Sequence, residues 1–135
     1  MTLPRAESMQ IQSPADVVLV RQMVRQLAVE LGFSLVEQTK VVTAASELAR
    51  NTLDYGGGGM VHLQTLDEGS RRGLKLCFED QGPGIPDVDL ALQDGYTTGN
   101  GLGLGLSGTK RLMNEFKIIS QPGTGTSVTV IKWKG

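Results

Sequence analysis

The sequence is poor in the residues that mark several common classes of protein. One cysteine and one histidine occur among 135 residues, so no internal disulfide can form and no Cys/His metal cluster can assemble. Aromatic residues amount to 4%, and the core must therefore be built mainly from Leu, Val, Ile and Ala. These shortages argue against a disulfide scaffold and a zinc module.

Neither the charge nor the hydropathy of the chain indicates that it binds nucleic acid or enters a membrane. Basic residues number 13 and acidic residues 14, for a formal net charge of −1. No basic stripe is present, so nucleic acid is not an expected partner. No apolar run approaches the ~20 residues that span a bilayer, and residues 1–9 lack the apolar segment of a signal peptide. We therefore expect no membrane association and a cytoplasmic location.

Glycine is the residue in excess, with 18 copies, roughly twice the average usage of about 7%. The glycines gather at residues 56–59, 82–84 and 99–108 instead of repeating with a period. This distribution indicates specialised loops and not a fibre. Because the chain has no linker or internal repeat, we expect one domain over residues 1–135.

Two helices are predicted in the first half of the chain. Ser13 and Pro14 have the form of an N-cap and first helical residue, and apolar residues then recur at helical spacing to about residue 31. Gly32 ends this helix. Ser34 and Glu37 form the S-x-x-E pattern of a capping box, which opens a second helix running through residue 54.

Strand patterns occupy most of the remainder. The predicted strands cover residues 9–12, 60–66, 74–78, 118–119 and 127–133. A third helix is expected over residues 106–116, and a short helix near 88–92 within the long loop that precedes it. The order β-α-α-β-β-α-β-β predicts an α/β fold, a two-layer α+β sandwich with helices on one face of a mixed sheet.

A first candidate motif lies on the second predicted helix. Glu47 and Asn51 are one helical turn apart, so the acid and the amide share a face that is separate from the apolar stripe. Such a pair can line a site. An isolated E-x-x-x-N is more often a solvated polar face.

A second candidate motif, EDQGPGIPD at residues 79–87, follows directly on an apolar strand. Asp80 at the strand end places an acceptor beside glycine backbone that can approach a flat ligand closely. An adenine amine could donate to such a carboxylate. Gly-Pro-Gly is also turn chemistry by itself, so a plain sharp turn remains an alternative.

A third candidate motif, NGLGLGL at residues 100–106, stands immediately before a predicted helix. Glycine-rich backbone at a helix N-terminus presents N–H groups to phosphate oxygens. The pattern also satisfies G-x-G-x-x-G, but no strand precedes it and no acid follows ~20 residues later. P-loop spacing is present too, yet Thr109-Lys110 reverses the required Lys-Ser/Thr order.

Taken in chain order, these motifs and a late Gly125-Thr126 pair resemble the ATP-binding domains of the GHKL (Bergerat-fold) superfamily. The resemblance extends from Ser13 to Trp133 and includes the element order. Within the superfamily, the chain is most similar to serine/threonine protein kinases of bacterial stress signalling. The similar phrases are SELARN (46–51), EDQGPGIPD (79–87), DGYTT (94–98), KRLMNEF (110–116) and IKW (131–133).

The resemblance implies roles for individual residues in binding Mg²⁺ and ATP. Asn51 would ligate Mg²⁺ at the phosphates, and Glu47 would be the general base for the attacking hydroxyl. Asp80 would accept from the adenine amine, while Gly82 and Gly84 would let the loop pack against the purine.

The remaining roles implied by the resemblance lie later in the chain. Gly101, Gly103 and Gly105 would turn backbone amides toward the phosphates, and Thr126 would reach adenine directly or through water. Residues 88–100 would form a lid. No basic residue stands just before the glycines, where related anti-sigma-factor kinases often carry arginine, so the group that meets the terminal phosphate stays open. Lys110 and Arg111 are candidates.

The resemblance also implies partners: STAS-domain stressosome proteins as substrates, and a PP2C-type phosphatase that is activated by binding. An anti-sigma factor or nucleotide-sensing adaptor with little catalysis is the alternative. A detached ATPase piece of a gyrase or mismatch-repair protein is less compatible with the short chain. A sensor histidine kinase is disfavoured because His62, the one histidine, falls inside a predicted strand.

Overall fold

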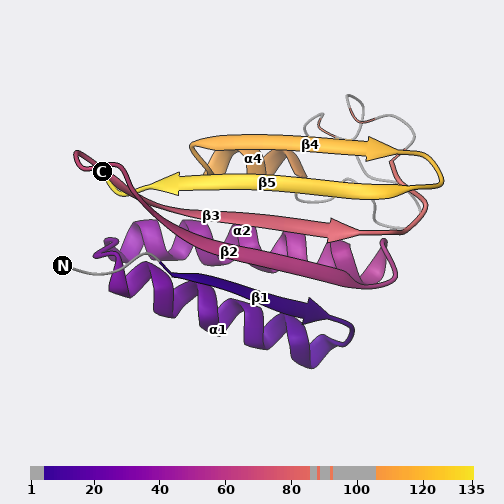
Figure 1. Cartoon of the computed structure of the whole chain (residues 1–135), viewed down its shortest axis with the longest axis horizontal. Helices are drawn as coiled ribbons and strands as arrows, with labels where there is room; N and C mark the ends of the chain where they lie inside the picture. Colours follow the sequence, from indigo (N-terminus) through magenta and orange to yellow (C-terminus); the bar gives the residue numbers. More distant parts are fainter. Residues whose placement is uncertain (1–4, 86–87, 89–91, 93–105) are drawn as a thin grey trace.

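The computed structural model describes residues 5–85, 88, 92 and 106–135. Five strands form one sheet, and the helices lie along one side of it (Figure 1). The elements in chain order are β1 (Ala6–Ile11), α1 (Pro14–Glu30), α2 (Leu35–Asp54), β2 (Gly59–Asp67), β3 (Arg72–Asp80), α4 (Leu106–Leu112), β4 (Glu115–Gln121) and β5 (Gly125–Trp133). This order and the two-layer α/β class confirm the fold expected from the sequence.

The strand order is β1-β2-β3-β5-β4, so β5 lies between β3 and β4. Every ladder among the described residues is antiparallel, and the expectation of a mixed sheet is wrong in this respect. The connections explain the difference. Two hairpins join β2 to β3 and β4 to β5, while α1 and α2 carry the chain away from β1 and back, so that β2 returns antiparallel to it.

Both predicted helix starts are confirmed. The Ser13 side chain accepts a hydrogen bond from the Asp16 backbone N–H, with Pro14 as the first helical residue. At α2 the capping box is complete, because the Glu37 N–H donates to Ser34 Oγ at 3.1 Å and the Ser34 N–H donates to Glu37 Oε1 at 2.7 Å. These caps satisfy backbone donors that the first helical turn leaves unpaired.

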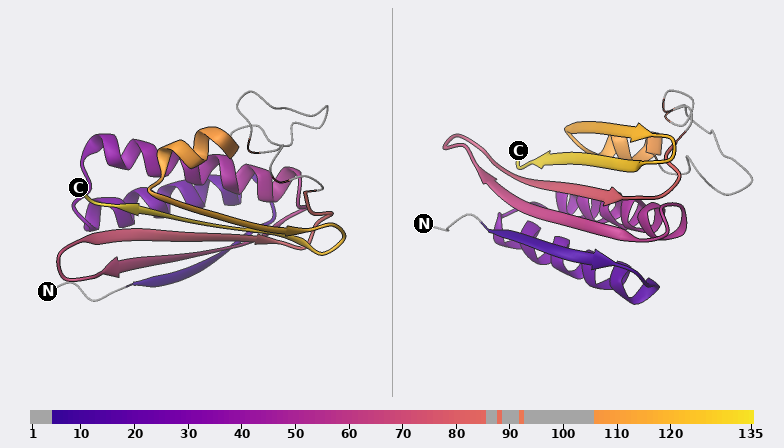
Figure 2. Two further views of the ribbon diagram at one scale, coloured as in Figure 1. Left: turned by 90° about the horizontal axis from the view of Figure 1, so that it is seen from above. Right: turned by 45° about the vertical axis from the view of Figure 1, so that its right-hand side comes forward.

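The view from above shows the helices in one layer and the sheet in the other (Figure 2), and the buried side chains of both layers form one core cluster. Alternate residues of β3 and β5 point inward and are buried, as strand periodicity requires. The helices contribute buried Val, Leu and Ala side chains to the same layer. The largest fully buried side chains are Phe78, Ile11, Leu27, Leu48, Leu63, Leu74 and Leu76. Leu, Val, Ile and Ala thus make up most of this core, as expected from the composition.

Two predicted boundaries are corrected by strand pairing. The third helix ends at Leu112 and not at residue 116, since β4 begins at Glu115 and pairs with β5 along its whole length. β3 continues to Asp80, two residues past the predicted end, because Asp80 pairs with Gly59 on one side and Thr126 on the other. In both cases, pairing with a strand distant in sequence determines where the helix or strand ends.

Two of the ionisable groups with altered pKa, Glu37 and Lys132, lie at the start of α2 and the end of β5. Burial lowers the pKa of Lys132, and the nearby Lys40 ammonium lowers it further. Partial burial opposes ionisation of Glu37, but hydrogen bonds from the backbone of Ser34 and Gly135 outweigh it and lower the pKa of the Glu37 carboxyl. This end of the sheet is opposite to the end that holds Asp80 and Thr126.

Within the described ranges, no helix has the length and apolar character needed to cross a bilayer. The same part of the chain contains no group of three or more His, Cys, Asp or Glu side chains placed to hold a metal ion.

Candidate functional site

Helix α2 ends against a turn of four glycines. The Asn51 carbonyl accepts the N–H groups of Tyr55 and Gly56, at 3.0 and 3.1 Å, and the Gly58 N–H donates to the Thr52 carbonyl at 2.9 Å. Gly58 has a φ of +106°, which a residue with a side chain rarely adopts. The glycine run therefore lets the chain leave the helix and enter β2 within a few residues.

Asp80 is the last residue of β3 and lies directly beside this turn. Its Oδ1 accepts the Gly82 N–H at 2.9 Å, which fixes the carboxylate at the strand end. On one side Asp80 pairs with Gly59, and on the other with Thr126. The carboxylate is half-buried and forms no salt bridge within the described part of the chain.

Glycine backbone surrounds Asp80. A Cβ on Gly56 would lie 2.5 Å from the Asp80 Cβ, and one on Gly82 would lie 2.7 Å from the Gly56 Cα. A Cβ on Gly125, whose φ is +132°, would collide with the Asp80 carbonyl oxygen. A side chain on Gly56 or Gly125 would therefore displace Asp80, and one on Gly82 would displace the Gly56 backbone beside it.

Gly84 has a similar packing role. Its φ is +77°, and a Cβ there would collide with the backbone of Gln121. The space that Gly82 and Gly84 leave is therefore filled by other loops of the protein itself. Their predicted contact with a purine stays a prediction.

A small cavity of about 30 Å³ lies between α2 and the inner face of the sheet. Asn51, Asp80 and Thr126, three of the residues predicted from the sequence, all line it. The other lining residues are Leu48, Thr52, Tyr55, Phe78, Ile85, Leu106 and Val128. An apolar wall with a few polar groups from three elements is typical of small-molecule sites.

The side-chain amide nitrogen of Asn51 has an unmet capacity to form hydrogen bonds within the described residues. Its Nδ2 is buried and has no hydrogen-bond partner in the described part of the chain. A buried polar group without a partner costs stability, of the order of 1–3 kcal/mol. Groups of this kind call for an explanation, and a bound ligand is one.

Glu47 lies one turn before Asn51 on α2 and is partly exposed. It is not among the residues that line the small cavity. Among the described residues it has no hydrogen bond or ion pair, so its carboxylate is available at the rim of α2 beside Asn51. The helix geometry predicted for this pair is confirmed, since both residues fall within the unbroken helix.

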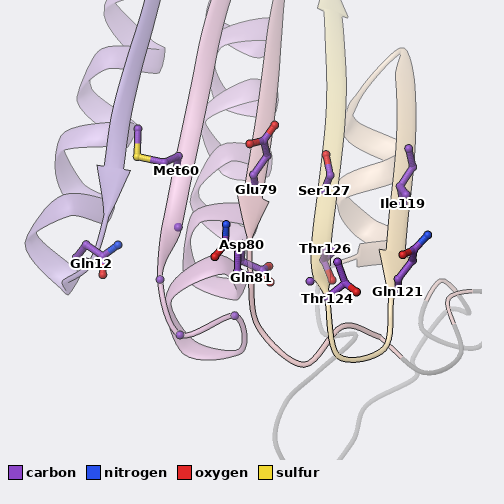
Figure 3. Close-up of a pocket in the computed structure, with 15 residues that line it drawn as sticks. Gln12, Met60, Glu79, Asp80, Gln81, Ile119, Gln121, Thr124, Thr126 and Ser127 are labelled. Atoms are coloured by element: carbon purple, nitrogen blue, oxygen red, sulfur yellow. The ribbon is translucent and has the colours of Figure 1, made fainter.

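A larger and more open cavity of about 760 Å³ lies at the same end of the sheet (Figure 3). Glu79, Ser127 and Ile119, which line it, belong to the face of the sheet turned away from the helices. Asp80 and Thr126 line both cavities, but Asn51 lines only the smaller one. We take the smaller cavity as the candidate site, because the buried unpaired amide and the convergent polar groups belong to it.

The outer face of the sheet carries a polar network that the sequence did not predict. His62 Nδ1 is 2.9 Å from Ser8 Oγ, and its Nε2 is 3.5 Å from Glu79 Oε2. Cys77 Sγ lies 3.7 Å from Ser127 Oγ. These groups bond to one another on an exposed surface, so their arrangement does not require a bound ligand.

The glycines predicted to contact phosphates, Gly101, Gly103 and Gly105, lie outside the described residues. So does nearly all of the predicted lid at residues 88–100, of which only Val88 and Leu92 are described.

Comparison with known proteins gives a consistent result. The sequence matches the family described as histidine kinase-, DNA gyrase B-, and HSP90-like ATPase over residues 36–134. It is 48% identical over 118 residues to the serine/threonine-protein kinase RsbT of Bacillus subtilis (strain 168), covering 87% of this chain and 89% of that protein. It is 34% identical over 104 residues to an anti-sigma F factor of Halalkalibacterium halodurans, covering 71% of this chain and 69% of that protein.

Among solved structures, the fold is similar to that of the RsbU and RsbW domains of Rv1364c from Mycobacterium tuberculosis. The TM-score is 0.65 at 19% sequence identity. The match covers 97% of this chain and 32% of that one, so the present chain spans about a third of its length. At this identity the similarity concerns the fold alone.

Proposed function

Because the chain belongs to the histidine kinase-, DNA gyrase B-, and HSP90-like ATPase family, and within it to the serine/threonine protein kinases similar to RsbT, we propose that it transfers the terminal phosphoryl group of Mg-ATP to a protein partner. The partner is a STAS-domain protein of a bacterial partner-switching pathway. The observation that carries this proposal is the buried Asn51 Nδ2, which has no hydrogen-bond partner among the described residues and belongs to a residue that lines one cavity with Asp80 and Thr126.

The cavity can recognise the adenine base. The Asp80 carboxylate is held by the Gly82 N–H and can accept a hydrogen bond from the adenine amine. The Thr126 hydroxyl, on the neighbouring strand, can contact the ring next to that amine. The described cavity is much smaller than a purine. Binding therefore requires apolar wall residues, such as Ile85 or Leu106, to move apart.

Asn51 fits the role of a magnesium ligand. Its amide offers an oxygen, the ligand type that Mg²⁺ prefers, and makes no hydrogen bond within the described part of the chain. Bound at Asn51 and the phosphates, Mg²⁺ would neutralise charge that builds on the phosphate oxygens during transfer. Gly101, Gly103 and Gly105 would add backbone N–H donors on the same phosphates.

Glu47 is proposed as the group that removes the proton of the attacking hydroxyl. The partner's Ser or Thr oxygen forms a bond to the terminal phosphorus, the bond to the ADP oxygen breaks, and the hydroxyl proton passes to the Glu47 carboxylate. The Glu47 carboxylate has no partner among the described residues and lies one turn from Asn51, the proposed magnesium ligand, so it is suitably placed for this.

A phosphoryl-transfer assay with radiolabelled ATP tests the proposal. The wild-type protein is incubated with Mg-ATP and its cognate STAS-domain protein, beside Glu47→Gln and Glu37→Gln. The second variant makes the same chemical change on the same helix, ten residues before Glu47 and near the other end of α2. We expect Glu47→Gln to lose roughly 100-fold or more in rate while retaining ATP binding, and Glu37→Gln to retain the rate. No transfer by a wild-type protein that binds ATP would refute the kinase.

The proposal extends to a second partner, a PP2C-type phosphatase that is activated by binding, and to a cytoplasmic location. Co-purification from the organism's own lysate tests both partner assignments. Recovery of a STAS-domain protein and a PP2C-type phosphatase supports them. Recovery of neither would remove them from the proposal.

An anti-sigma factor is the second candidate function, because relatives with 30–34% identity carry that name. Such a protein would bind a sigma factor directly. Co-purification of a sigma factor, with no label transfer to any STAS-domain protein, would favour this function over the first.

A further inference from the structure

Helix α1 carries apolar side chains on the face that is turned away from the core. Val18, Leu19 and Val29 are 47%, 51% and 57% exposed. The buried residues of α1 lie on its opposite side, and the neighbours of the helix are α2 and β1 (Figure 1). Single exposed apolar residues are ordinary on protein surfaces, but three on one side of a helix form a candidate contact surface.

The exposed residues of α1 have the spacing of a helix-docking surface. Val18, Gln22, Arg25 and Val29, here called the outer stripe, follow one another at intervals of four, three and four residues, and all four are exposed. At about 100° per residue they fall within roughly 60° of one another, with Leu19 beside them. Such intervals are those at which one helix packs against another.

Two arginines accompany the outer stripe, and neither has a carboxylate partner. Arg21 forms no hydrogen bond or ion pair within the described residues. The Arg25 guanidinium donates to the Gln38 amide oxygen on α2 at 3.4 Å. No salt bridge in the described part of the chain includes either arginine. A partner can therefore gain two charge pairs by bringing carboxylates to this face.

The acidic residues of α1 do not supply these carboxylates. Asp16 accepts the backbone N–H of Gln12 at 2.8 Å, and Glu30 is paired with Arg5 at 2.6 Å. Both lie more than about 90° around the helix from Val18. The outer face of α1 is thus apolar and positively charged.

This charge argues against a second copy of the chain as the occupant. In a two-fold pair, each face meets an identical face. A register that buries Val18 and Val29 of both copies places all four arginines within about one turn of its centre. Neither face has a carboxylate to offset their repulsion, so like charges oppose this pairing.

A lipid surface also fits this face poorly. Gln22 lies in the middle of the outer stripe, and Gln26 lies beside it and is exposed. In hydrocarbon both amides would lose their hydrogen bonds to water without gaining others. A protein helix can bond to these amides with polar side chains of its own.

We propose that the outer stripe of α1 docks an amphipathic helix of a partner protein, one that carries apolar residues along its contact face and Asp or Glu beside them. Val18, Leu19 and Val29 pack against the apolar residues, and the two arginines pair with the carboxylates. No residue of α1 lines either cavity. The docked helix leaves the nucleotide site open, so this inference goes beyond the proposed function and does not depend on it.

Fluorescence anisotropy with a labelled synthetic helix tests the inference. The probe has about three heptads, with Leu at positions a and d and Glu at e and g. A control probe has Lys in place of each Glu. The glutamates repel one another, which keeps the acidic probe from pairing with itself. We expect wild type to bind the acidic probe at least about tenfold more tightly than the basic one at low salt, and added salt to reduce this difference.

A pair of charge reversals tests the role of the arginines. Arg21→Glu combined with Arg25→Glu should weaken binding of the acidic probe about tenfold or more. The matched control is Lys75→Glu combined with Lys117→Glu, which changes the net charge equally on the outer face of the sheet. Because distant charges are screened at physiological ionic strength, this control should weaken binding less than about threefold.

A second double variant tests the apolar residues. Val18→Ala combined with Val29→Ala removes apolar area from the outer stripe and should weaken binding of the acidic probe about fivefold or more. Alanine favours a helix more than valine does, so the Tm should not fall. A loss of binding at an unchanged or higher Tm belongs to the surface and not to unfolding.

Several results would overturn the inference: no binding of the acidic probe by wild type, equal affinity for both probes, or equal losses in the arginine and lysine double variants. A dimer that Val18→Ala with Val29→Ala dissociates, seen by sedimentation equilibrium, would assign the face to a second copy instead. Binding to phosphatidylcholine–phosphatidylserine vesicles in place of the acidic probe would assign it to lipid. The arginine double variant should keep wild-type phosphoryl transfer. A wild-type protein without transfer would overturn the proposed function and leave this inference standing.

Discussion

Gly56→Ala is the substitution for which the structure gives the sharpest expectation. The new Cβ would lie 2.5 Å from the Asp80 Cβ and 2.7 Å from Asp80 Oδ2. Ordinary contact begins at 3.4 Å, so the two carbons must separate by 3.4 minus 2.5, or about 0.9 Å. Asp80 is held in ladders on both sides. The strain therefore falls on its side chain and on the glycine turn.

Two measurable losses follow from this displacement. Overpacking of a rigid site costs about 1–3 kcal/mol, which lowers the Tm of a domain of this size by roughly 3–12 °C. An Asp80 carboxylate moved by about 1 Å would lose the hydrogen bond that we propose it accepts from the adenine amine, and we expect ATP affinity to fall roughly 10- to 150-fold. Differential scanning calorimetry measures the first effect, and titration calorimetry with ATP measures the second.

Gly108→Ala is the matched control for the same chemical change. A Cβ on Gly108 would meet no atom of the described residues within 4 Å, and the residue belongs to helix α4. Alanine in a helix is more stable than glycine by about 0.5–1 kcal/mol, so this variant should have a higher Tm. The reasoning fails if Gly56→Ala keeps both the wild-type Tm and the wild-type ATP affinity.

Three further predictions use other parts of the molecule. Asp80→Asn should weaken ATP binding about 5- to 150-fold by calorimetry, and an unchanged affinity would remove Asp80 from the adenine site. Glu37→Gln should reduce the unfolding free energy by about 0.5–1 kcal/mol at neutral pH. Since the folded-state pKa of Glu37 lies below the ordinary 4.5, this difference from wild type should shrink as the pH falls below that value. A constant difference down to acid pH in urea titrations would count against it. Lys132→Met should raise the Tm by a few degrees, because burial and Lys40 disfavour the ammonium. The advantage should decrease as the pH rises toward 10.5, the ordinary lysine value, where wild type is relieved of the charge. A lower Tm for this variant at pH 7 would contradict the assignment.

The parts of the fold that depend on neighbours in sequence could be predicted. Ser13 and the Ser34–Glu37 capping box act within one helical turn, and both helix starts were predicted correctly. The hydrophobic alternation of β3 and β5 identified strands for the same reason. The end of the third helix depends on pairing between β4 and β5, which helical spacing in residues 106–116 does not reveal.

The candidate site could be predicted only in part. The spacing of Glu47 and Asn51 follows from helix geometry, but the meeting of Asn51 with Asp80 and Thr126 came from the family resemblance. The sequence indicated only that Gly56 belongs to a glycine-rich loop, although this residue packs against the Asp80 carboxyl group.

The position of β5 has a consequence for how the protein becomes functional during synthesis. This strand, residues 125–133, is inserted between two strands that precede it in the chain. Thr126 can therefore join Asp80 only after that segment has left the ribosome. A nascent chain shorter than this has an open gap in its sheet and an incomplete binding cavity, so nucleotide cannot assist the early steps of folding.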